Sequence, residues 1–472
     1  MTALDHPARH ADGPERPPER VPFPVVDEVS RHCLQEEEPE TVHIEVHLPG
    51  TPDPARLKAA FTEALRRHPR ILMREARGPW YRRRYEWELT AEPDVEVVTF
   101  PAPERDALKK ARTRSLSEAP PLSASPPIRL EVIASEPAAK AVAPGGDNGS
   151  GSAASTPDAP GSGSVLFLTI NHTALDGPAC LRVLATAAEL YGGQDNSPAA
   201  PPLRTASSDA PESAMDVGDA PSGWAPPARV SRGTPEPSPG NGMLVSELPV
   251  PRRPKGAPFT VNDQLMVATA LMIAHWNREH GARPKPFRIT MPVDDRPRSM
   301  EMPIGNGTRL VEVPFSAAEL TSEEWGPEDI GALLRRTAER TRALKALSRP
   351  QLGRGAALLT SPVLPVVLRA AVTRGLRRAA APWTSTTLLS NIGRVPYSLD
   401  FGDAGRAHAV WFSAPARLPR GLTVTTASTA GRLHVAFRWS KSLLSSGDGA
   451  HLRDLFEHYL HATEHTEEGK TP

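Results

Sequence analysis

The sequence contains very little cysteine and carries no net charge, and both facts exclude classes of protein. Its two cysteines among 472 residues, Cys33 and Cys180, form neither a disulfide framework nor a zinc site. Basic and acidic residues number 55 each, whereas a general nucleic-acid binder would be strongly basic. The first 22 residues lack the apolar segment of a secretory signal, and no apolar run reaches the ~18–20 residues of a membrane helix. We therefore expect a cytoplasmic protein without a membrane span.

Proline and glycine are abundant, at 53 and 34 of 472 residues. Their combined share of the sequence stays below the ~25–30% that marks a wholly disordered chain. They gather in residues 1–21, 136–164 and 194–242, tracts with too few apolar side chains to offset the entropy of ordering. Strand-like residues flank the second tract, which we interpret as an expanded hairpin loop. The predicted organisation is a disordered N-terminus (1–21), an N-terminal lobe (22–193) with the loop insertion 136–164, a Pro-rich linker (194–242), a C-terminal lobe (243–465) and a tail (466–472).

Periodicity predicts strands and helices in both lobes. Alternation over residues 42–48 predicts a half-buried strand, with His43, Glu45 and His47 on its polar face. Asp53 followed by proline is typical of a helix start. Because the elements mix without regular βαβ repetition, we predict an α+β fold. Further predicted strands cover 128–133, 165–170, 287–293, 386–389, 409–412, 422–428 and 433–439, and further helices cover 178–191, 260–277, 328–348, 363–380 and 449–465.

The sharpest chemical feature is the segment NHTALDG at residues 171–177, directly after an apolar strand. A histidine at a strand end can face a cleft, and its ordinary pKa near 6.5 suits the removal of a proton from a hydroxyl or amine. Asp176 either orients the His172 imidazole or braces the loop from behind. The structural alternative is a turn histidine, with Asp176 capping the next helix.

The longer segment FLTINHTALDG at residues 167–177 resembles the HHxxxDG or HxxxDG motif of the condensation-domain and acyltransferase superfamily. This group includes nonribosomal-peptide condensation domains, BAHD acyltransferases, polyketide-associated acyltransferases and chloramphenicol acetyltransferase. The resemblance covers roughly residues 22–193 and 243–465. Four other segments are similar to the superfamily's in the same order: FPVVD (23–27), LRRHPRIL (65–72), TMPVDDRPR (290–298) with Gly305 and Asn306, and SNIGR (390–394).

The resemblance implies two chloramphenicol acetyltransferase-like lobes in one chain, with an active-site tunnel between them. It assigns His172 and Asp176 to the catalytic motif, as the catalytic histidine and the structural aspartate. It matches Arg296 to an arginine that pairs with this aspartate from the second lobe, and Gly177 would let the backbone pass close to the substrate. Asn171 stands where the full condensation motif has its first histidine, which weakens peptide condensation more than acyl transfer.

Two further sets of residues have both a functional and a structural interpretation. Ser390 and Asn391 are candidates to donate hydrogen bonds to a tetrahedral oxyanion, or Asn391 bonds its own backbone in a turn. Two arginine-rich helices form a basic mouth for coenzyme A phosphates or an acidic carrier protein, or they are solvated faces. Their basic residues are Arg335, Arg336, Arg340, Arg342 and Lys345 in one helix, and Arg369, Arg374, Arg377 and Arg378 in the other.

Four histidines near the C-terminus, at positions 451, 458, 461 and 465, include a pair with the i, i+4 spacing of some zinc sites. The apolar stripe of this helix already accounts for the segment, so we predict no metal site. Dinucleotide-binding GxGxxG, phosphate-binding P-loop and GxSxG signatures are absent from the sequence. We expect no tightly bound cofactor.

The predicted function is acyl transfer from a thioester to a hydroxyl or amine of a small, natural-product acceptor, with His172 as general base. The co-substrate would be acyl-CoA or the phosphopantetheinyl thioester of an acyl carrier protein. Two alternatives remain open. The chain is a free-standing condensation enzyme that joins carrier-bound substrates through an amide or ester, or it is a non-catalytic docking or scaffold relative.

Overall fold

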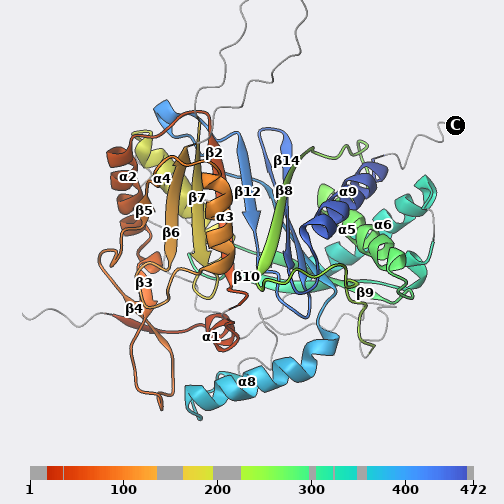
Figure 1. The fold of residues 1–472 in the computed structure, drawn as a ribbon, viewed down its shortest axis with the longest axis horizontal. Coiled ribbons are helices and arrows are strands. Elements are labelled where there is room, and N and C mark those ends of the chain that lie inside the picture. The colour runs from red at the N-terminus through yellow and green to blue at the C-terminus, as the bar shows by residue number, and fades with distance from the viewer. Residues whose placement is uncertain are drawn as a thin grey trace, which may run out of the picture.

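The structure is a computed structural model that describes residues 19–35, 37–134, 163–194, 225–296, 304–322, 325–347 and 359–464. Within these ranges the strands form sheets of five, six and three strands, and helices cover the two larger sheets (Figure 1). Antiparallel and parallel pairing occur together, and consecutive strands are not joined by regular helical crossovers. The arrangement confirms the predicted α+β class.

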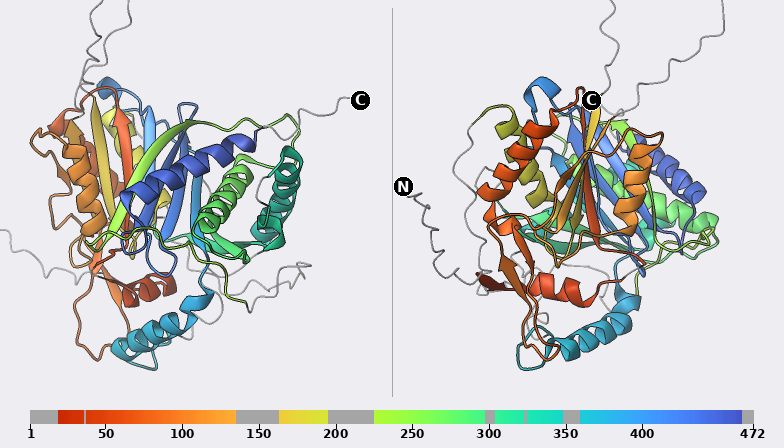
Figure 2. Two further views of the ribbon diagram at one scale, coloured as in Figure 1. Left: turned by 45° about the vertical axis from the view of Figure 1, so that its right-hand side comes forward. Right: turned by 60° about the vertical axis from the view of Figure 1, so that its left-hand side comes forward.

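The first lobe is built on the five-stranded sheet, in the order β12-β2-β7-β6-β5. Helices α2 (Pro54–Arg67) and α4 (Gly177–Tyr191) cover one face, and α3 (Ala107–Ser117) covers the other (Figure 2). Asp53 caps α2 as predicted, because its side chain accepts a hydrogen bond from the backbone N–H of Arg56 at 2.8 Å. The strands are β2 (Thr41–Leu48), β5 (Val98–Thr99), β6 (Ile128–Ala134), β7 (Ser164–Asn171) and β12 (Ala409–Ser413).

Strands β6 and β7 form the predicted hairpin. They pair antiparallel from Ile128 opposite Ile170 to Ala134 opposite Ser164. Most of the predicted loop, residues 135–162, lies outside the described residues, and β7 begins inside the range predicted as loop. The two strands on either side of the Pro-Gly-Ser tract are therefore neighbours in one sheet.

The second lobe is built on the six-stranded sheet, in the order β10-β9-β11-β13-β14-β8. Helix α5 (Val261–Glu279) is buried along most of its length because it contacts the sheet as well as helices α6 (Pro327–Ala346) and α9 (Ser446–Ala462), which also pack on the sheet. Burial on all sides explains why its sequence is apolar all round. The strands are β8 (Asn241–Pro249), β9 (Phe287–Asp294), β10 (Thr308–Phe315), β11 (Thr387–Arg394), β13 (Leu422–Thr429) and β14 (Arg432–Ser440); β8 and β10 were not predicted.

Two helices, α1 (Val25–His32) and α8 (Val366–Ala380), pack against each other below the sheets in the view of Figure 1. Arg369 of α8 is buried and pairs with Glu28 of α1 at 2.6 Å. No helix in the described ranges has both the length and the apolar character to cross a bilayer. The remaining elements are the small sheet of β1 (Arg20–Pro22), β3 (Met73–Glu75) and β4 (Glu86–Leu89), and 3-10 helices at Pro69–Ile71, Ala318–Leu320, Ala381–Trp383 and Gly402–Ala404.

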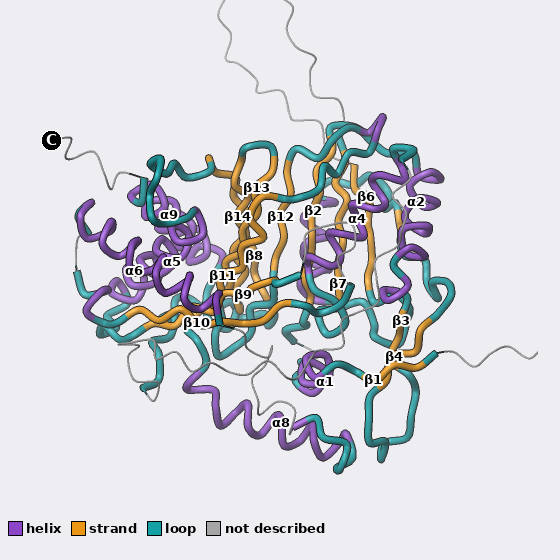
Figure 3. The backbone as a smooth tube through the Cα atoms, turned by 180° about the vertical axis from the view of Figure 1, so that it is seen from behind, coloured by secondary structure: helices purple, strands orange, loops and turns teal. Residues whose placement is uncertain are grey.

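Strand β12 lies in a different lobe from the one predicted. The sequence places it in the C-terminal lobe, but it pairs antiparallel with β2, from Ala409 opposite His47 to Ser413 opposite His43. Phe401, which precedes it, is fully buried in the first core. Seen from behind, β12 lies between β2 and the strands of the second lobe (Figure 3). The alternation of a strand identifies its faces but not the sheet it joins, so composition and spacing alone do not place β12.

Residues 225–240 also differ from the prediction, which assigned them to a Pro-rich linker. Ala228 and Val230 are buried in the core of the second lobe. Between them, the guanidinium of Arg229 donates to the backbone carbonyl of Thr384 at 2.8 Å. Ordered structure therefore resumes before the predicted lobe boundary at residue 243, because a few apolar side chains are enough to fix an extended segment against a core.

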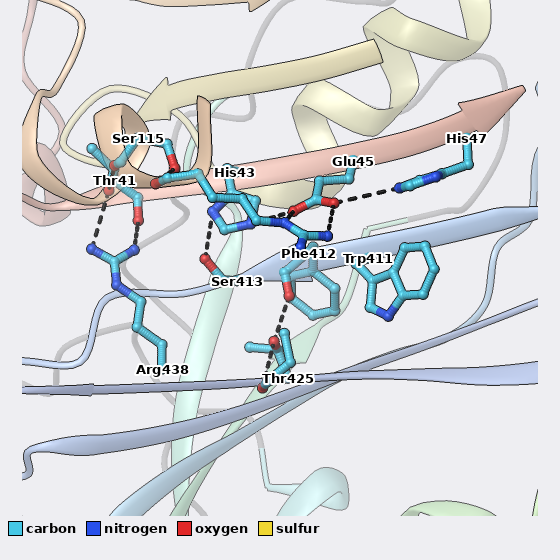
Figure 4. A network of polar contacts seen from close by, with 12 residues as sticks. Thr41, His43, Glu45, His47, Ser115, Trp411, Phe412, Ser413, Thr425 and Arg438 are labelled. Carbon is cyan, nitrogen blue, oxygen red and sulfur yellow. Dashed lines mark hydrogen bonds and ion pairs between the residues drawn. The ribbon is translucent and has the colours of Figure 1, made fainter. Parts of the chain in front are cut away.

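The polar face of β2 is buried, although its alternation predicts an exposed one (Figure 4). Glu45 accepts hydrogen bonds from the Arg112 guanidinium of α3 at 2.7 and 2.8 Å. The Nε2 atoms of His43 and His47 each lie 3.4 Å from its carboxylate. Burial alone would raise the pKa of Glu45, but hydrogen bonds from His43, His47 and Arg112 outweigh it and hold the pKa well below its usual value.

Arg438 of β14 links the second lobe to the start of β2 (Figure 4). Its guanidinium donates to the carbonyl and hydroxyl of Thr41, at 2.7 and 3.1 Å, and to the side-chain oxygen of Asn241 at 2.7 Å. Burial lowers the pKa of Arg438 to about 9, so it remains charged at neutral pH. Ser413 of β12 lies 2.7 Å from Nδ1 of His43. These contacts make β2 a seam between the lobes.

We expect Arg112→Met to lower the free energy of unfolding by about 3 kcal/mol, because it leaves the buried Glu45 charge with histidine partners alone. Urea denaturation at pH 7 measures the change. The double variant Arg112→Met with Glu45→Gln should recover part of the loss. Lys110→Met on the same helix, which breaks an exposed pair with Glu104 in the preceding turn, is the control and should cost less than about 1 kcal/mol. Equal losses in the single and double variants would contradict the ion-pair account.

Candidate active site

A cavity of about 540 Å³ lies between the two lobes. Its wall combines the turn between β7 and α4, strands β9 and β11, and the segment between β12 and β13. The resemblance implies an active-site tunnel at this position. Among the predicted site residues, five line the cavity: His172, Asp176, Gly177, Ser390 and Asn391.

His172 is held by the backbone on both sides. Its backbone N–H donates to the carbonyl of Glu40 at 2.8 Å, and its ring Nδ1 lies 3.0 Å from the carbonyl oxygen of Leu175. Because a carbonyl only accepts, Nδ1 carries the hydrogen and Nε2 of the neutral ring carries the lone pair. The ring lines the cavity. The site therefore presents a proton acceptor in a fixed tautomer.

Asp176 stands behind the loop and its oxygens contact other groups than the imidazole. Oδ1 caps helix α4 by accepting from the backbone N–H of Ala179 at 3.0 Å. Oδ2 accepts from Nη2 of Arg296 at 2.8 Å and from the backbone N–H of Gly307 at 2.9 Å. Of the two roles left open by the sequence, bracing of the loop is the one these bonds serve. These contacts hold the loop that carries His172.

Arg296 connects this aspartate to the second lobe, where the resemblance expects such an arginine. Its guanidinium donates to Asp176, to Asp294 through Nε at 2.8 Å, and to the carbonyl of Gly305 at 2.8 Å. Burial lowers the pKa of Arg296, but the charges and hydrogen bonds of Asp176 and Asp294 outweigh it, so the pKa is raised above its usual value. The guanidinium is permanently charged and fully used in holding the loop.

Asn306 and Asp27 form a second link that the sequence analysis quoted without giving it a role. Nδ2 of Asn306 donates to the carbonyl of Thr173 at 3.0 Å and to Asp27 of α1 at 2.8 Å. The other Asp27 oxygen accepts from the indole of Trp87 at 2.9 Å. Burial is the main reason that the pKa of Asp27 is raised to about 7. The signal in the sequence was the matched FPVVD and Gly305–Asn306 segments.

Asn171 and Gly177 flank the motif and act on the backbone. The side chain of Asn171 donates to the carbonyl of Pro120 at 2.9 Å and accepts from the N–H of Thr173 at 3.1 Å. It is buried and fixes the turn that carries His172. Gly177 begins α4 at the cavity wall, where an added Cβ would lie 3.7 Å from Val42, an ordinary contact. Its lack of a side chain therefore affects the cavity rather than the packing around it.

Ser390 and Asn391 lie on β11 at the cavity wall. The side-chain oxygen of Asn391 accepts from the N–H of Gly393 at 2.8 Å and from the hydroxyl of Thr426 at 3.0 Å. Its Nδ2 donates to Asn262 at 3.3 Å. Asn391 bonds nearby backbone, as its structural interpretation expects, but it does so within a strand rather than a turn. Pairing with β13 shifts register between Asn391 and Gly393, so this bond stabilises a bulge.

The two arginine-rich helices contribute one basic residue each to the cavity wall, Lys345 from α6 and Arg377 from α8. Arg336 and Arg340 instead pair with Glu319 at 2.9 and 2.8 Å. Most of the basic residues named for these two helices therefore do not line the cavity. Two arginines from the segment between β12 and β13, Arg417 and Arg420, lie on the same wall and were not considered from the sequence.

The C-terminal histidines contact nearby carboxylates. Nε2 of His451 lies 2.8 Å from Glu279, and Nδ1 of His461 lies 3.2 Å from Glu464. Residue 465 lies outside the described residues. Within those residues, no cluster of three or more histidine, cysteine, aspartate or glutamate side chains is arranged to hold a metal ion.

We compared the chain with known proteins by sequence and by structure. No family model matches the sequence. Two uncharacterized proteins of Mycobacterium tuberculosis, from strains H37Rv and CDC 1551, are each 27% identical over 408 residues, which cover 80% of this chain and 84% of the relative.

Among solved structures, a trichothecene 15-O-acetyltransferase from Fusarium sporotrichioides aligns with a TM-score of 0.60 and 12% identity, over 94% of this chain and 95% of its own. The condensation domain of the monacolin K polyketide synthase MokA gives a TM-score of 0.56 at 12% identity, over 94% and 97%. The first condensation domain of the calcium-dependent antibiotic synthetase gives 0.54 at 14%, over 90% and 92%. At these identities the likeness establishes the fold, and it confirms the predicted two-lobed, chloramphenicol acetyltransferase-like architecture.

We expect Gly307→Ala to loosen the site from behind. A Cβ at this position would overlap the Arg296 side chain, whose guanidinium three hydrogen-bond partners, Asp294, Gly305 and Asp176, prevent from moving aside. The free energy of unfolding should fall by about 1–3 kcal/mol, measured by urea denaturation. Gly177→Ala adds the same methyl group in the same site, where it fits, and should change stability little. Equal effects of the two substitutions would contradict the close approach at Gly307.

Proposed function

We propose that this chain, which has the two-lobed fold of chloramphenicol acetyltransferase-like proteins, is an acyltransferase. It would move an acyl group from a thioester donor to a hydroxyl or amine of a small acceptor. One observation carries the proposal: the His172 ring lines a cavity between the lobes, with Nδ1 bonded to the Leu175 carbonyl and Nε2 left as a base. The tautomer matches the role, because a general base needs its lone pair on the nitrogen that meets the acceptor.

In the proposed reaction Nε2 of His172 removes the proton from the acceptor O–H or N–H as its oxygen or nitrogen attacks the thioester carbonyl. The carbonyl oxygen becomes an oxyanion, for which Ser390 on the cavity wall is a candidate donor. The intermediate collapses when the carbon–sulfur bond breaks, and the leaving thiolate takes the proton from the imidazolium. The acyl group ends on the acceptor and His172 returns to its neutral form. No covalent enzyme intermediate is required.

The basic side of the cavity fits a thioester donor that carries phosphate. Arg417 forms an ion pair with Glu40, whereas Arg420 contacts only neutral hydroxyls, those of Ser385 at 3.1 Å and Thr290 at 3.3 Å, among the described residues. Burial lowers the pKa of Arg420 to about 10, so it stays charged at neutral pH. Coenzyme A and carrier-bound phosphopantetheine both offer a phosphate to such a guanidinium.

Thiol release from a panel of acyl-CoAs, with a mixed pool of hydroxyl and amine acceptors, tests the reaction. We expect His172→Ala to abolish release, a loss of at least about 100-fold, while urea denaturation shows the fold intact. Asn171→Ala in the same turn is the comparison, because it loosens the turn without removing the base. Release by His172→Ala at the wild-type rate would overturn the mechanism.

The same assay separates the alternatives. Offering an acylated carrier protein as a second donor identifies the free-standing condensation function if only carrier-bound thioesters react. An intact wild type that releases thiol from neither donor leaves the non-catalytic scaffold and contradicts the proposal.

We expect Arg420→Gln to raise the KM for acyl-CoA about tenfold with little change in kcat, because the guanidinium binds the donor in the ground and transition states alike. The KM for an N-acetylcysteamine thioester, which has no phosphate, should stay constant. Arg335→Gln, an exposed arginine of α6 away from the cavity wall, is the control. Equal effects on the two donors would contradict a phosphate contact.

A further inference from the structure

The exposed large hydrophobic side chains of this protein concentrate on one surface. The structure exposes twelve of them in its described ranges, and nine belong to α8, its flanking residues and the loop between β3 and β4. Their exposed fractions run from 42% to 76%, so these are not side chains that merely touch solvent at one edge. We call this the α8 surface; its nine residues are Trp80, Tyr81, Val363, Leu364, Val367, Leu368, Val372, Leu376 and Trp383.

Helix α8 turns one face to the protein, and no described residue covers the opposite face. Val366 and Ala370 are buried together with Arg369, which forms the ion pair with Glu28. The exposed face repeats at the spacing of a helix turn, with pairs at 367/368, 371/372 and 375/376. It holds only valine, leucine, alanine and glycine. The inward contacts fix the orientation of the helix, so its apolar face cannot rotate inward.

The loop between β3 and β4 extends the same surface. The backbone N–H of Val366 donates to the carbonyl of Arg82 at 2.9 Å, and Arg369 donates to the carbonyl of Arg83 at 2.8 Å. Trp80 and Tyr81 on this loop therefore lie next to the start of α8, and loop and helix together form the lower edge of the molecule in Figure 1. Trp383 lies beyond the other end of the helix. Aromatic side chains thus flank an aliphatic stripe at both ends.

The charges around the stripe have one sign. Residues 340–399 contain ten lysines and arginines and no aspartate or glutamate. Arg374 and Arg378 are exposed beside the stripe, and Arg77, Arg83 and Arg84 are exposed on the loop, which also lacks acidic residues. In a chain with zero net charge, this is a strong local asymmetry.

We propose that the α8 surface binds to an anionic phospholipid bilayer. An aliphatic helix face with arginines at its sides is the pattern of helices that lie in the plane of a membrane interface, and tryptophan and tyrosine favour that interface. The fifteen residues of α8 are fewer than the ~20 that span a bilayer, so we place the helix on the membrane surface. An acidic protein could also pair with the arginines. The outward face of the helix between residues 367 and 376, however, presents no hydrogen-bonding side chain to such a partner.

Membrane binding would bring the cavity to the bilayer. Arg377 of α8 lines the cavity, as do Leu310 and Leu418, which are themselves 48% and 43% exposed. Arg377 therefore links α8 to the cavity, whose wall also includes these two exposed apolar side chains. Resting on the proposed acyl transfer, this arrangement assigns one substrate to the class of amphiphiles with a long hydrocarbon chain, delivered from the lipid phase.

Co-sedimentation with vesicles tests the docking directly. We expect the full chain to bind vesicles of phosphatidylcholine with 30% phosphatidylglycerol, more weakly at high salt and weakly to phosphatidylcholine alone. Leu368→Glu with Leu376→Glu should reduce binding at least about tenfold, because it places charge in the inserted face. Val95→Glu, at an exposed apolar residue outside the α8 surface, should bind as wild type does. Wild type that stays in the supernatant, or equal loss in both variants, would overturn the proposal.

The charged part is tested separately. Arg374→Gln with Arg378→Gln should weaken binding to the anionic vesicles about 30-fold and bring it close to binding to neutral vesicles. The proposal would be overturned if the wild type bound an acidic carrier protein but no vesicles, and if the leucine variant lost that binding. The α8 surface would then be a protein-binding surface.

These outcomes are independent of the proposed reaction. His172→Ala should bind vesicles like wild type, and the leucine variant should release thiol from short, water-soluble acyl-CoAs at the wild-type rate. Failure of thiol release in wild type therefore rejects the reaction alone, and failure of vesicle binding rejects the docking alone.

Discussion

The carboxylate of Asp176 accepts hydrogen bonds from three donors on three parts of the chain: the first turn of α4, the Arg296 guanidinium and the backbone of Gly307. The first belongs to one lobe and the other two to the second. The turn that carries His172 lies between them, and Asn306 adds a bond to the carbonyl of Thr173. The position of the candidate base is therefore set by both lobes at once. Any separation of the lobes would withdraw the partners of a buried charge.

The remainder of the interface follows the same principle. Glu40 with Arg417 and Glu28 with Arg369 are ion pairs with little exposure of the carboxylate. Buried ionic groups are costly unless their partners are in place, so they contribute more to the choice of one arrangement than to net stability. Apolar packing alone would tolerate small shifts between the lobes. The ionic contacts do not, and a cavity lined by both lobes requires that accuracy.

Several features of this arrangement follow from the sequence because they depend on neighbours along the chain. The hairpin of β6 and β7, the capped start of α2 and the turn that carries His172 are all local, and the ordered motifs gave the fold and the pairing partner of Asp176. The features that the sequence did not predict depend on residues that are distant along the chain but adjacent in the fold. The alternation of β2 shows two faces, but nothing in residues 41–48 indicates that Arg112, Ser413 and Arg438 cover the polar one. The role of Asn306 likewise depends on contacts with residues more than a hundred positions away, Thr173 and Asp27. The sequence also does not indicate that Arg420 lies at the cavity.

Strand β12 has a consequence for how this protein is made. It forms the edge of the first sheet, yet it is encoded some 360 residues after β2, its partner. During synthesis the edge of β2 stays open until nearly the whole second lobe has left the ribosome. The half of the chain that is made first therefore cannot complete its own sheet. It emerges with an unpaired strand that must be kept from other chains until its last neighbour arrives. For the same reason the lobes cannot be exchanged as separate modules by recombination, because a break anywhere between them leaves the first sheet one strand short.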